Sequence, residues 1–122
     1  TLTGAMRVAV GLDVAGYFSN HDKYAREVEV AAIDYGEAIW RMPLLQKYRK
    51  MFSTPFADMK NSSDSGFAGA IIAALFLEKF TRHTPWVHFD MMAWSNSADG
   101  AFSEGANAQG FQVLAGVLLN RE

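Results

Sequence analysis

The longest apolar run of the chain is GFAGAIIAALFLEKF, residues 66–80. It falls short of the about 20 apolar residues that a membrane-spanning helix needs, and Glu78 and Lys79 place charges near its end. A helix that is apolar on all sides has to be covered on all sides, so we expect this one to be central in a soluble core. We also expect the Ser-Asp-Ser triplet at residues 63–65 to cap its first turn.

The segments on either side of this run alternate between strand and helix patterns. Residues 14–18 and 86–92 are predicted strands. Apolar side chains recur at intervals of three and four over residues 24–39, which predicts an amphipathic helix, and Ser19-x-x-Asp22 resembles a capping box before it.

Proline and glycine mark the remaining elements. Pro43 permits a new helical start that continues to about residue 51, and Pro55 ends it. Residues 57–60 are predicted as a loop or a short strand, and residues 107–119 as a final helix weakened by Gly110 and Gly116. Strands that alternate with helices predict an α/β fold with helix, sheet and helix layers. Two or three strands make a thin sheet, so we expect further strands elsewhere in the protein.

Composition narrows the functional classes. The 122 residues, half of them hydrophobic, are enough for one core. The formal net charge of −2 lacks the basic excess of a nucleic-acid surface, so a nucleic-acid partner is not expected. No membrane partner is expected either. The absence of cysteine excludes disulfides and thiolate catalysis and is typical of a reducing cytoplasm, where we expect the protein to act.

His88 and Asp90 form the strongest candidate for chemistry. They stand two residues apart in a predicted strand, so both side chains point to one face. Such a pair can bind a metal or act as an acid–base couple. Alternatively, the histidine donates a core hydrogen bond and the aspartate accepts bonds from loop N–H groups. We favour this alternative, because no third ligand stands at a regular spacing.

The other polar residues give weaker signals. Asp58 and Asp64, near Lys60, could form a cation site, but a polar capping loop is the simpler interpretation. No serine lies in a G-x-S-x-G context and no glycine-rich phosphate loop occurs, so a serine hydrolase or a nucleotide enzyme has no support.

Five segments resemble the leucyl (cytosol) aminopeptidase family, in the order in which that family has them. They are TLTGA at 1–5, VGLDVAGYFSN at 10–20, PFADMKN at 55–61, residues 66–80, and TPWVHFDM at 84–91. The resemblance implies that residues 1–122 are the C-terminal part of a larger mixed-sheet metallopeptidase catalytic domain, a single but incomplete unit. It also implies that no catalytic residue and no metal ligand lies in this segment, because the family carries both upstream of the TLTGA turn.

The same resemblance assigns substrate-binding residues. In the family the TLTGA turn lies along the substrate and bonds the peptide main chain, a part that Thr1, Leu2 and Gly4 take here, with Leu2 at the carbonyl-contacting position. Main-chain bonds orient a peptide whatever its side chains. Matching the strand places Met92 on the wall of the pocket for the substrate's first side chain, where family members often have a small residue. Residues 94–107 depart from the family and are expected to reshape the pocket mouth or a subunit contact.

Two functions remain open at this point. The first is a metalloaminopeptidase that acts on peptide substrates as a homo-hexamer, with two divalent ions (Mn or Zn) held by upstream residues. The second is a non-catalytic interaction module with an aminopeptidase-like fold. An Asn-Thr-Asp-Ala-Glu-Gly-Arg stretch immediately before Thr1 would favour the enzyme, because in the family it carries metal ligands and the catalytic arginine.

Overall fold

The computed structural model describes residues 4–100 and 103–120. In chain order the elements are α1 (Ala5–Val10), β1 (Ala15–Ser19), α2 (Asp22–Tyr35), β2 (Ile39–Arg41), the 3-10 helix η1 (Gln46–Phe52), α3 (Gly69–Glu78), β3 (Val87–Asp90), β4 (Trp94–Ser95), β5 (Gly105–Ala106) and α4 (Phe111–Leu119). Within these ranges no helix is long and apolar enough to cross a bilayer.

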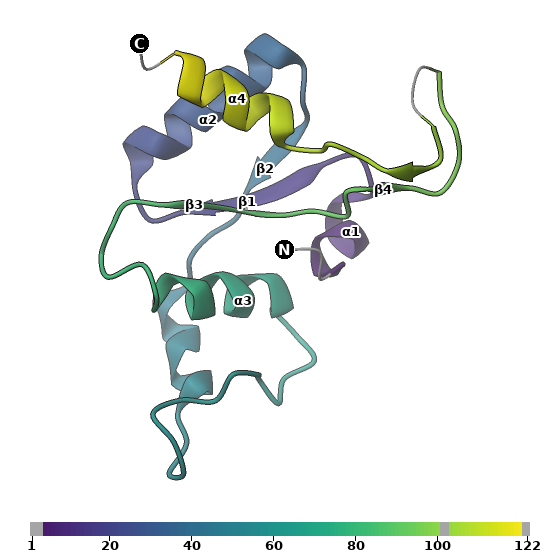
Figure 1. Ribbon diagram of the computed structural model, residues 1–122. Helices are drawn as coiled ribbons and strands as arrows, with labels where there is room; N and C mark the ends of the chain where they lie inside the picture. The colour runs from purple at the N-terminus through teal and green to yellow at the C-terminus, as the bar shows by residue number, and fades with distance from the viewer. Residues whose placement is uncertain (1–3, 101–102, 121–122) are drawn as a thin grey trace.

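A three-stranded mixed sheet in the order β2-β1-β3 forms the middle layer. β1 runs parallel to β2, with Ala15 opposite Ile39, and antiparallel to β3, with Gly16 opposite Asp90. Helices α2 and α4 cover one face of this sheet, and α1 and α3 lie on the other (Figure 1). The predicted α/β fold with helix, sheet and helix layers is confirmed.

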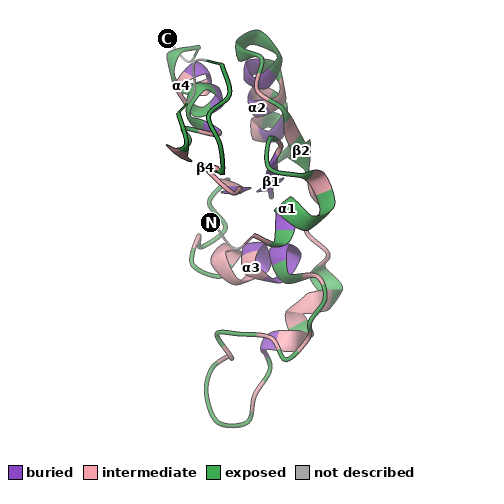
Figure 2. Ribbon diagram, turned by 90° about the vertical axis from the view of Figure 1, so that its right-hand side faces the viewer, coloured by how far each residue is buried: buried purple, intermediate pink, exposed green. Residues whose placement is uncertain are grey.

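Both faces of β1 are buried, because each faces a separate apolar cluster. Phe18 points into a cluster with Met6 and the buried face of α3. Its neighbour Tyr17 points the other way, into a cluster formed with α2, β3 and α4. This alternation is the period of two that a strand requires. Figure 2 shows the buried residues gathered along the inner faces of α2 and α3.

Helix α3 is the apolar helix predicted from residues 66–80, but it begins at Gly69 and ends at Glu78, and its residues 70–78 are buried or half-buried. Its N-cap is Ala68, with φ of 60° and no capping side chain, so a cap from residues 63–65 is a wrong prediction. The Ser65 hydroxyl instead accepts a bond from the Phe67 N–H inside the loop, the local alternative that serine offers a backbone. Phe67 and Phe80 belong to the predicted run but lie outside the helix, and they are 84% and 61% exposed.

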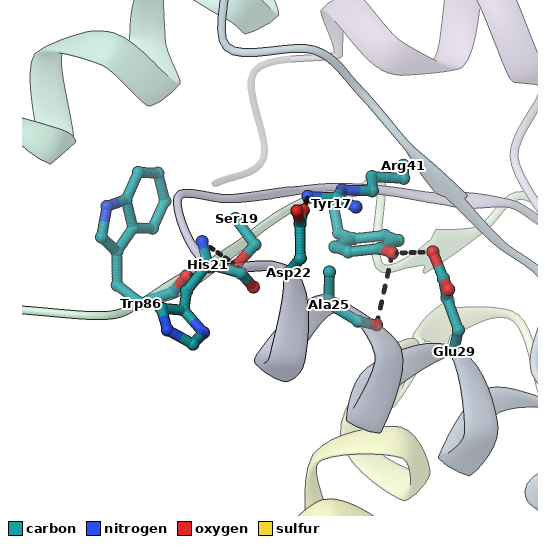
Figure 3. A network of polar contacts seen from close by, with 8 residues as sticks. All are labelled: Tyr17, Ser19, His21, Asp22, Ala25, Glu29, Arg41 and Trp86. Carbon is teal, nitrogen blue, oxygen red and sulfur yellow. Dashed lines mark hydrogen bonds and ion pairs between the residues drawn. The ribbon is translucent and has the colours of Figure 1, made fainter.

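Helix α2 ends earlier than its apolar spacing predicts. Gly36 adopts φ of 68° and closes the helix, so Ile39 lies in β2 and pairs with Ala15. The predicted capping box is also wrong, because the N-cap is His21. Ser19 is instead the last residue of β1. Its hydroxyl accepts a bond from the His21 N–H (3.2 Å) and donates to the Trp86 carbonyl (2.9 Å; Figure 3).

The connection between β2 and α3 extends away from the sheet (Figure 1). The expected helix near residues 43–51 is the 3-10 helix η1, and residues 57–60 form a loop. The strand predicted over residues 86–92 and the helix predicted over 107–119 are present in shorter form, as β3 and α4. Three features were not predicted: the short helix α1, the strand β2, and the pairing of β4 with β5.

Candidate functional site

Of the four residues expected to bind substrate, Gly4 and Met92 lie in the described part, whereas Thr1 and Leu2 lie outside it. Gly4 precedes α1 and adopts φ of 76°, a left-handed conformation that glycine tolerates best. Met92 lies in the loop after β3, two residues beyond the last strand residue, Asp90. The two positions belong to opposite parts of the chain.

The side chain of Arg7 connects these two positions. Its Nη1 atom lies 3.4 Å from Met92 Sδ, and a β-carbon added to Gly4 would lie 3.0 Å from Arg7 Nε. Arg7 stands three residues after Gly4, so one turn of α1 brings the two onto the same face. Sequence analysis did not single out Arg7. The only signal for it was the spacing Gly4-x-x-Arg7, which has meaning once residues 5–10 are known to be helical.

Arg7 is exposed, and no carboxylate of residues 4–100 or 103–120 forms an ion pair with it. A guanidinium carries five N–H donors, and a thioether sulfur is a weak acceptor. Within the described ranges, the contact with Met92 therefore leaves most of the N–H donors of Arg7 unused.

Gln109 holds the loop after β3 against the loop after α1. Its Oε1 accepts a bond from the Ala93 N–H (3.2 Å), and its Nε2 donates to the Leu12 carbonyl (3.2 Å). The Ala93 carbonyl accepts a further bond from the Asn107 N–H (3.0 Å). Ala93, the residue after Met92, is therefore held through both its N–H and its carbonyl, and its φ of 49° is uncommon for a residue other than glycine.

Glu37 fixes the start of α4 beside this loop. Its two carboxylate oxygens each accept a 2.9 Å bond, from the Gly110 and Val113 N–H groups. A carboxylate at a helix N-terminus satisfies free donors and is favoured by the helix dipole. Because Gln109 directly precedes Gly110, this cap also positions the side chain that holds the loop around Met92.

Two short strands within residues 94–107, the segment expected to reshape the pocket mouth or a subunit contact, pair with each other beyond the end of β3. Trp94 pairs with Ala106 and Ser95 with Gly105, as the antiparallel strands β4 and β5 (Figure 1). Trp94 is 48% exposed. The segment starts two residues after Met92 and returns to Gln109.

His88 and Asp90 are placed as core residues. The His88 ring stacks on Phe18, with centroids 5.9 Å apart, and Asp90 is fully buried. Burial lowers the pKa of His88 to about 4, so the ring is neutral at pH 7. Within the described ranges, no three His, Asp or Glu side chains are grouped so that they could hold a metal ion.

Asp64 forms an ion pair with Lys60 across one turn of the loop, whereas Asp58 is exposed. The pair agrees with the interpretation of this region as a polar loop. No second carboxylate is brought to Asp64 by any interaction described for residues 57–65.

A second polar network joins β1, α2 and β2 (Figure 3). The buried Tyr17 hydroxyl donates to Glu29 Oε1 at 2.6 Å, and burial raises the pKa of Tyr17 above its ordinary value. Arg41 Nη2 bonds Asp22 Oδ1 at 2.6 Å, a contact that lowers the pKa of Asp22. Each pair joins a strand to α2, so both pairs stabilise the fold.

Comparisons with known proteins agree on one family. The pattern of the cytosol aminopeptidase family, catalytic domain, matches residues 1–115. The probable cytosol aminopeptidase of Trichodesmium erythraeum is 43% identical over 122 residues, which is 98% of this chain and 24% of that protein. The chain thus spans about a quarter of the length of its curated relatives.

Solved structures give the same result. The cytosol aminopeptidase of Coxiella burnetii matches with a TM-score of 0.90 and 36% identity, over 98% of this chain and 26% of that one. The bottromycin maturation enzyme BotP in complex with Mn matches with a TM-score of 0.88 and 29% identity, over 98% and 27%. This chain therefore belongs to the cytosol aminopeptidase family and matches part of its catalytic domain.

Proposed function

We propose that these residues are the C-terminal part of the catalytic domain of a metal-dependent exopeptidase, which hydrolyses N-terminal amino acids from peptides. The observation that carries the proposal is the family match over residues 1–115, supported by a fold that superimposes on cytosol aminopeptidases along nearly the whole chain. The proposed location is the cytoplasm, in agreement with the curated relatives, which are probable cytosol aminopeptidases.

In this proposal the segment binds and orients the substrate. Thr1, Leu2 and Gly4 bond the peptide main chain, and Met92 lines the pocket for the first side chain. Two observations support these roles. Gly4 has no side chain between its backbone and a ligand, and Arg7 contacts Met92 although 85 positions separate them in sequence. A turn and a pocket wall that share a neighbouring side chain can act on one substrate residue.

The metals belong to another part of the protein. The described residues do not fit a two-metal site, because they contain no group of three His, Asp or Glu ligands. On the basis of the family resemblance, we propose that two divalent ions, Mn or Zn, are held by residues upstream of Thr1; the relative BotP is described in complex with Mn. Such ions would activate water and polarise the scissile carbonyl. The residues of this chain align the peptide bond and shape the pocket.

We further propose that the intact protein is a homo-hexamer. Exposed apolar side chains on the outer face of α4 support a larger contact surface, since Phe111 and Leu118 are 66% and 68% exposed. The alternative function, a non-catalytic interaction module, would apply if the residues before Thr1 lacked metal ligands and the catalytic arginine.

The role of the turn can be tested in the intact, manganese-loaded protein by Gly4→Ala. A methyl group there meets Arg7 Nε at 3.0 Å and forces a left-handed alanine, so kcat/KM should fall for all substrates alike. The matched control is Gly36→Ala, which creates the same backbone strain at φ of 68° but meets no atom within 4 Å. Equal kinetic effects of the two variants would contradict the proposed role of Gly4. Absence of any metal-dependent peptide hydrolysis by the wild type would instead favour the interaction module.

A further inference from the structure

We propose that Arg7 is a specificity residue that selects substrates with an acidic N-terminal residue, aspartate or glutamate. The inference rests on the proposed function, because it assigns a substrate class to the same pocket. Arg7 carries a charge, whereas the two residues that it contacts are a glycine and a methionine, Gly4 and Met92.

The position of the guanidinium is the first argument. Arg7 Nη1 contacts Met92 Sδ at 3.4 Å, and Nε and Cζ lie 3.0 and 3.2 Å from the place of a β-carbon on Gly4. One planar group thus lies against Gly4, which the proposed function places beside the substrate's main chain, and against Met92, which it places on the wall of the first-side-chain pocket. A substrate side chain that enters between Gly4 and Met92 therefore meets a positive charge.

The second argument is the unused capacity of that charge. Among the described residues, Arg7 forms no ion pair, and its one side-chain bond goes to a weak sulfur acceptor. A carboxylate matches the guanidinium fork with two parallel bonds, and such charge-assisted bonds are about twice as strong as neutral ones. A lysine or arginine side chain in the same place would be repelled.

The backbone on both sides of the Arg7–Met92 contact is held in place by the fold. Arg7 follows Met6, which is 3% exposed and packed in the core, and its carbonyl accepts the Gly11 N–H that closes α1 (3.0 Å). On the other side, Gln109 holds the backbone next to Met92. Both ends of the Arg7–Met92 contact are thus fixed by bonds that do not involve the substrate.

The test compares glutamyl and glutaminyl substrates, which have nearly the same shape but differ in charge. In the intact, manganese-loaded protein the wild type should favour glutamyl over glutaminyl substrate in kcat/KM by roughly ten-fold or more, because bonds to charged groups contribute about that much. Arg7→Gln should reduce this ratio to near one, and Arg7→Lys should retain part of it. The matched control is Arg26→Gln, an exposed arginine on α2 across the sheet, which should leave the ratio unchanged.

Ionic strength gives a second readout that a purely structural role of Arg7 would not move. The wild-type preference for glutamyl substrate should decrease as salt rises, whereas the ratio of Arg7→Gln should not respond. Free glutamate should inhibit the wild type more strongly than free glutamine, and this difference should decrease as salt rises and be absent in Arg7→Gln.

Two outcomes would overturn the inference, and they can be told apart. A wild type that cleaves leucyl peptides but shows no glutamyl preference, or one whose preference survives Arg7→Gln, contradicts the role of Arg7 alone. A wild type that cleaves none of the substrates contradicts the proposed function, and the role of Arg7 with it.

Discussion

Met6 of α1 lies directly on Gly16 of β1, so that a β-carbon on Gly16 would stand 2.3 Å from Met6 Cε. Gly16 in turn pairs with Asp90, the last residue of β3. The missing side chain in the central strand is therefore what lets α1 come close to the sheet. Because Gly4 and Arg7 flank Met6, this contact sets the distance between them and Met92.

Gly16→Ala should consequently destabilise the fold. The added methyl meets three atoms of the buried Met6 side chain within 2.9 Å, and overpacking of this kind costs about 1–3 kcal/mol. Met6→Ala alone should cost about 2–5 kcal/mol through the cavity it leaves. The double variant should lose less than the sum, because the smaller residue makes room for the methyl. Free energies of unfolding from urea titrations give all the values, and strict additivity would show that the two residues do not share the space.

Met92→Ala in the intact enzyme should deepen the first-side-chain pocket. Removing the outer atoms of the side chain should favour leucyl over alanyl substrates by roughly ten-fold or more, since one methylene in an apolar pocket contributes about 1–3 kcal/mol. Kinetics on both substrates, with metal content measured in parallel, would test this. If the ratio stays constant while stability falls by a few kcal/mol, Met92 is a core residue and lies outside the pocket.

Acid should weaken the fold through His88. Its pKa in the folded state is about 4, below the ordinary 6.5, so protonation favours the unfolded chain. The contribution is fully present above about pH 6.5 and is lost as the pH falls toward 4. His88→Phe keeps a ring against Phe18 but cannot titrate. Unfolding free energies at pH 7 and 4.5 should therefore differ less in this variant, and an equal difference in both proteins would assign the acid sensitivity to other groups.

The isolated 122-residue chain should show no peptidase activity and no tight divalent-metal site. The reason is chemical, because stable sites need several converging ligands, and none are grouped in residues 4–100 and 103–120. Calorimetric titration with manganese and with zinc would measure this. A stoichiometric site of micromolar or better affinity that disappears in Asp90→Asn would establish the His88–Asp90 pair as a ligand set.

The layers of the fold could be predicted from the sequence because they depend on local patterns. Apolar spacing predicted α2, an unbroken apolar run predicted α3, and the segments 14–18, 86–92 and 107–119 predicted β1, β3 and α4. The same spacing misplaced Ile39, which continues the α2 stripe in sequence although Gly36 has already ended the helix. The short strand β2 forms because it pairs with β1, and such a pairing between distant segments cannot be seen in a local sequence pattern.

The candidate site was proposed from the family resemblance, and no local pattern in the sequence indicated it. Arg7 was missed because α1 has six residues and its decisive contact joins positions 85 apart. Gly116 was interpreted as a weak point of the last helix. The structure shows a reason for it: a β-carbon there would lie 2.3 Å from Tyr35 Cε2 and 3.3 Å from Ala31 Cβ, so the glycine lets α4 lie close to α2. The roles of Arg7 and Gly116 both depend on contacts between elements that are far apart in the sequence.

The pairing of β1 with β3 has a consequence for the order of events during synthesis. The Ser19 hydroxyl bonds the Trp86 carbonyl across 67 positions of sequence, and at about 5–20 residues per second a ribosome needs roughly 3–13 s to add that length. Until then one edge of β1 has no partner strand, and the apolar faces of Tyr17 and Phe18 await α4 and α3. The most buried strand of the finished fold is thus exposed for seconds on the nascent chain, when a wrong partner can pair with it.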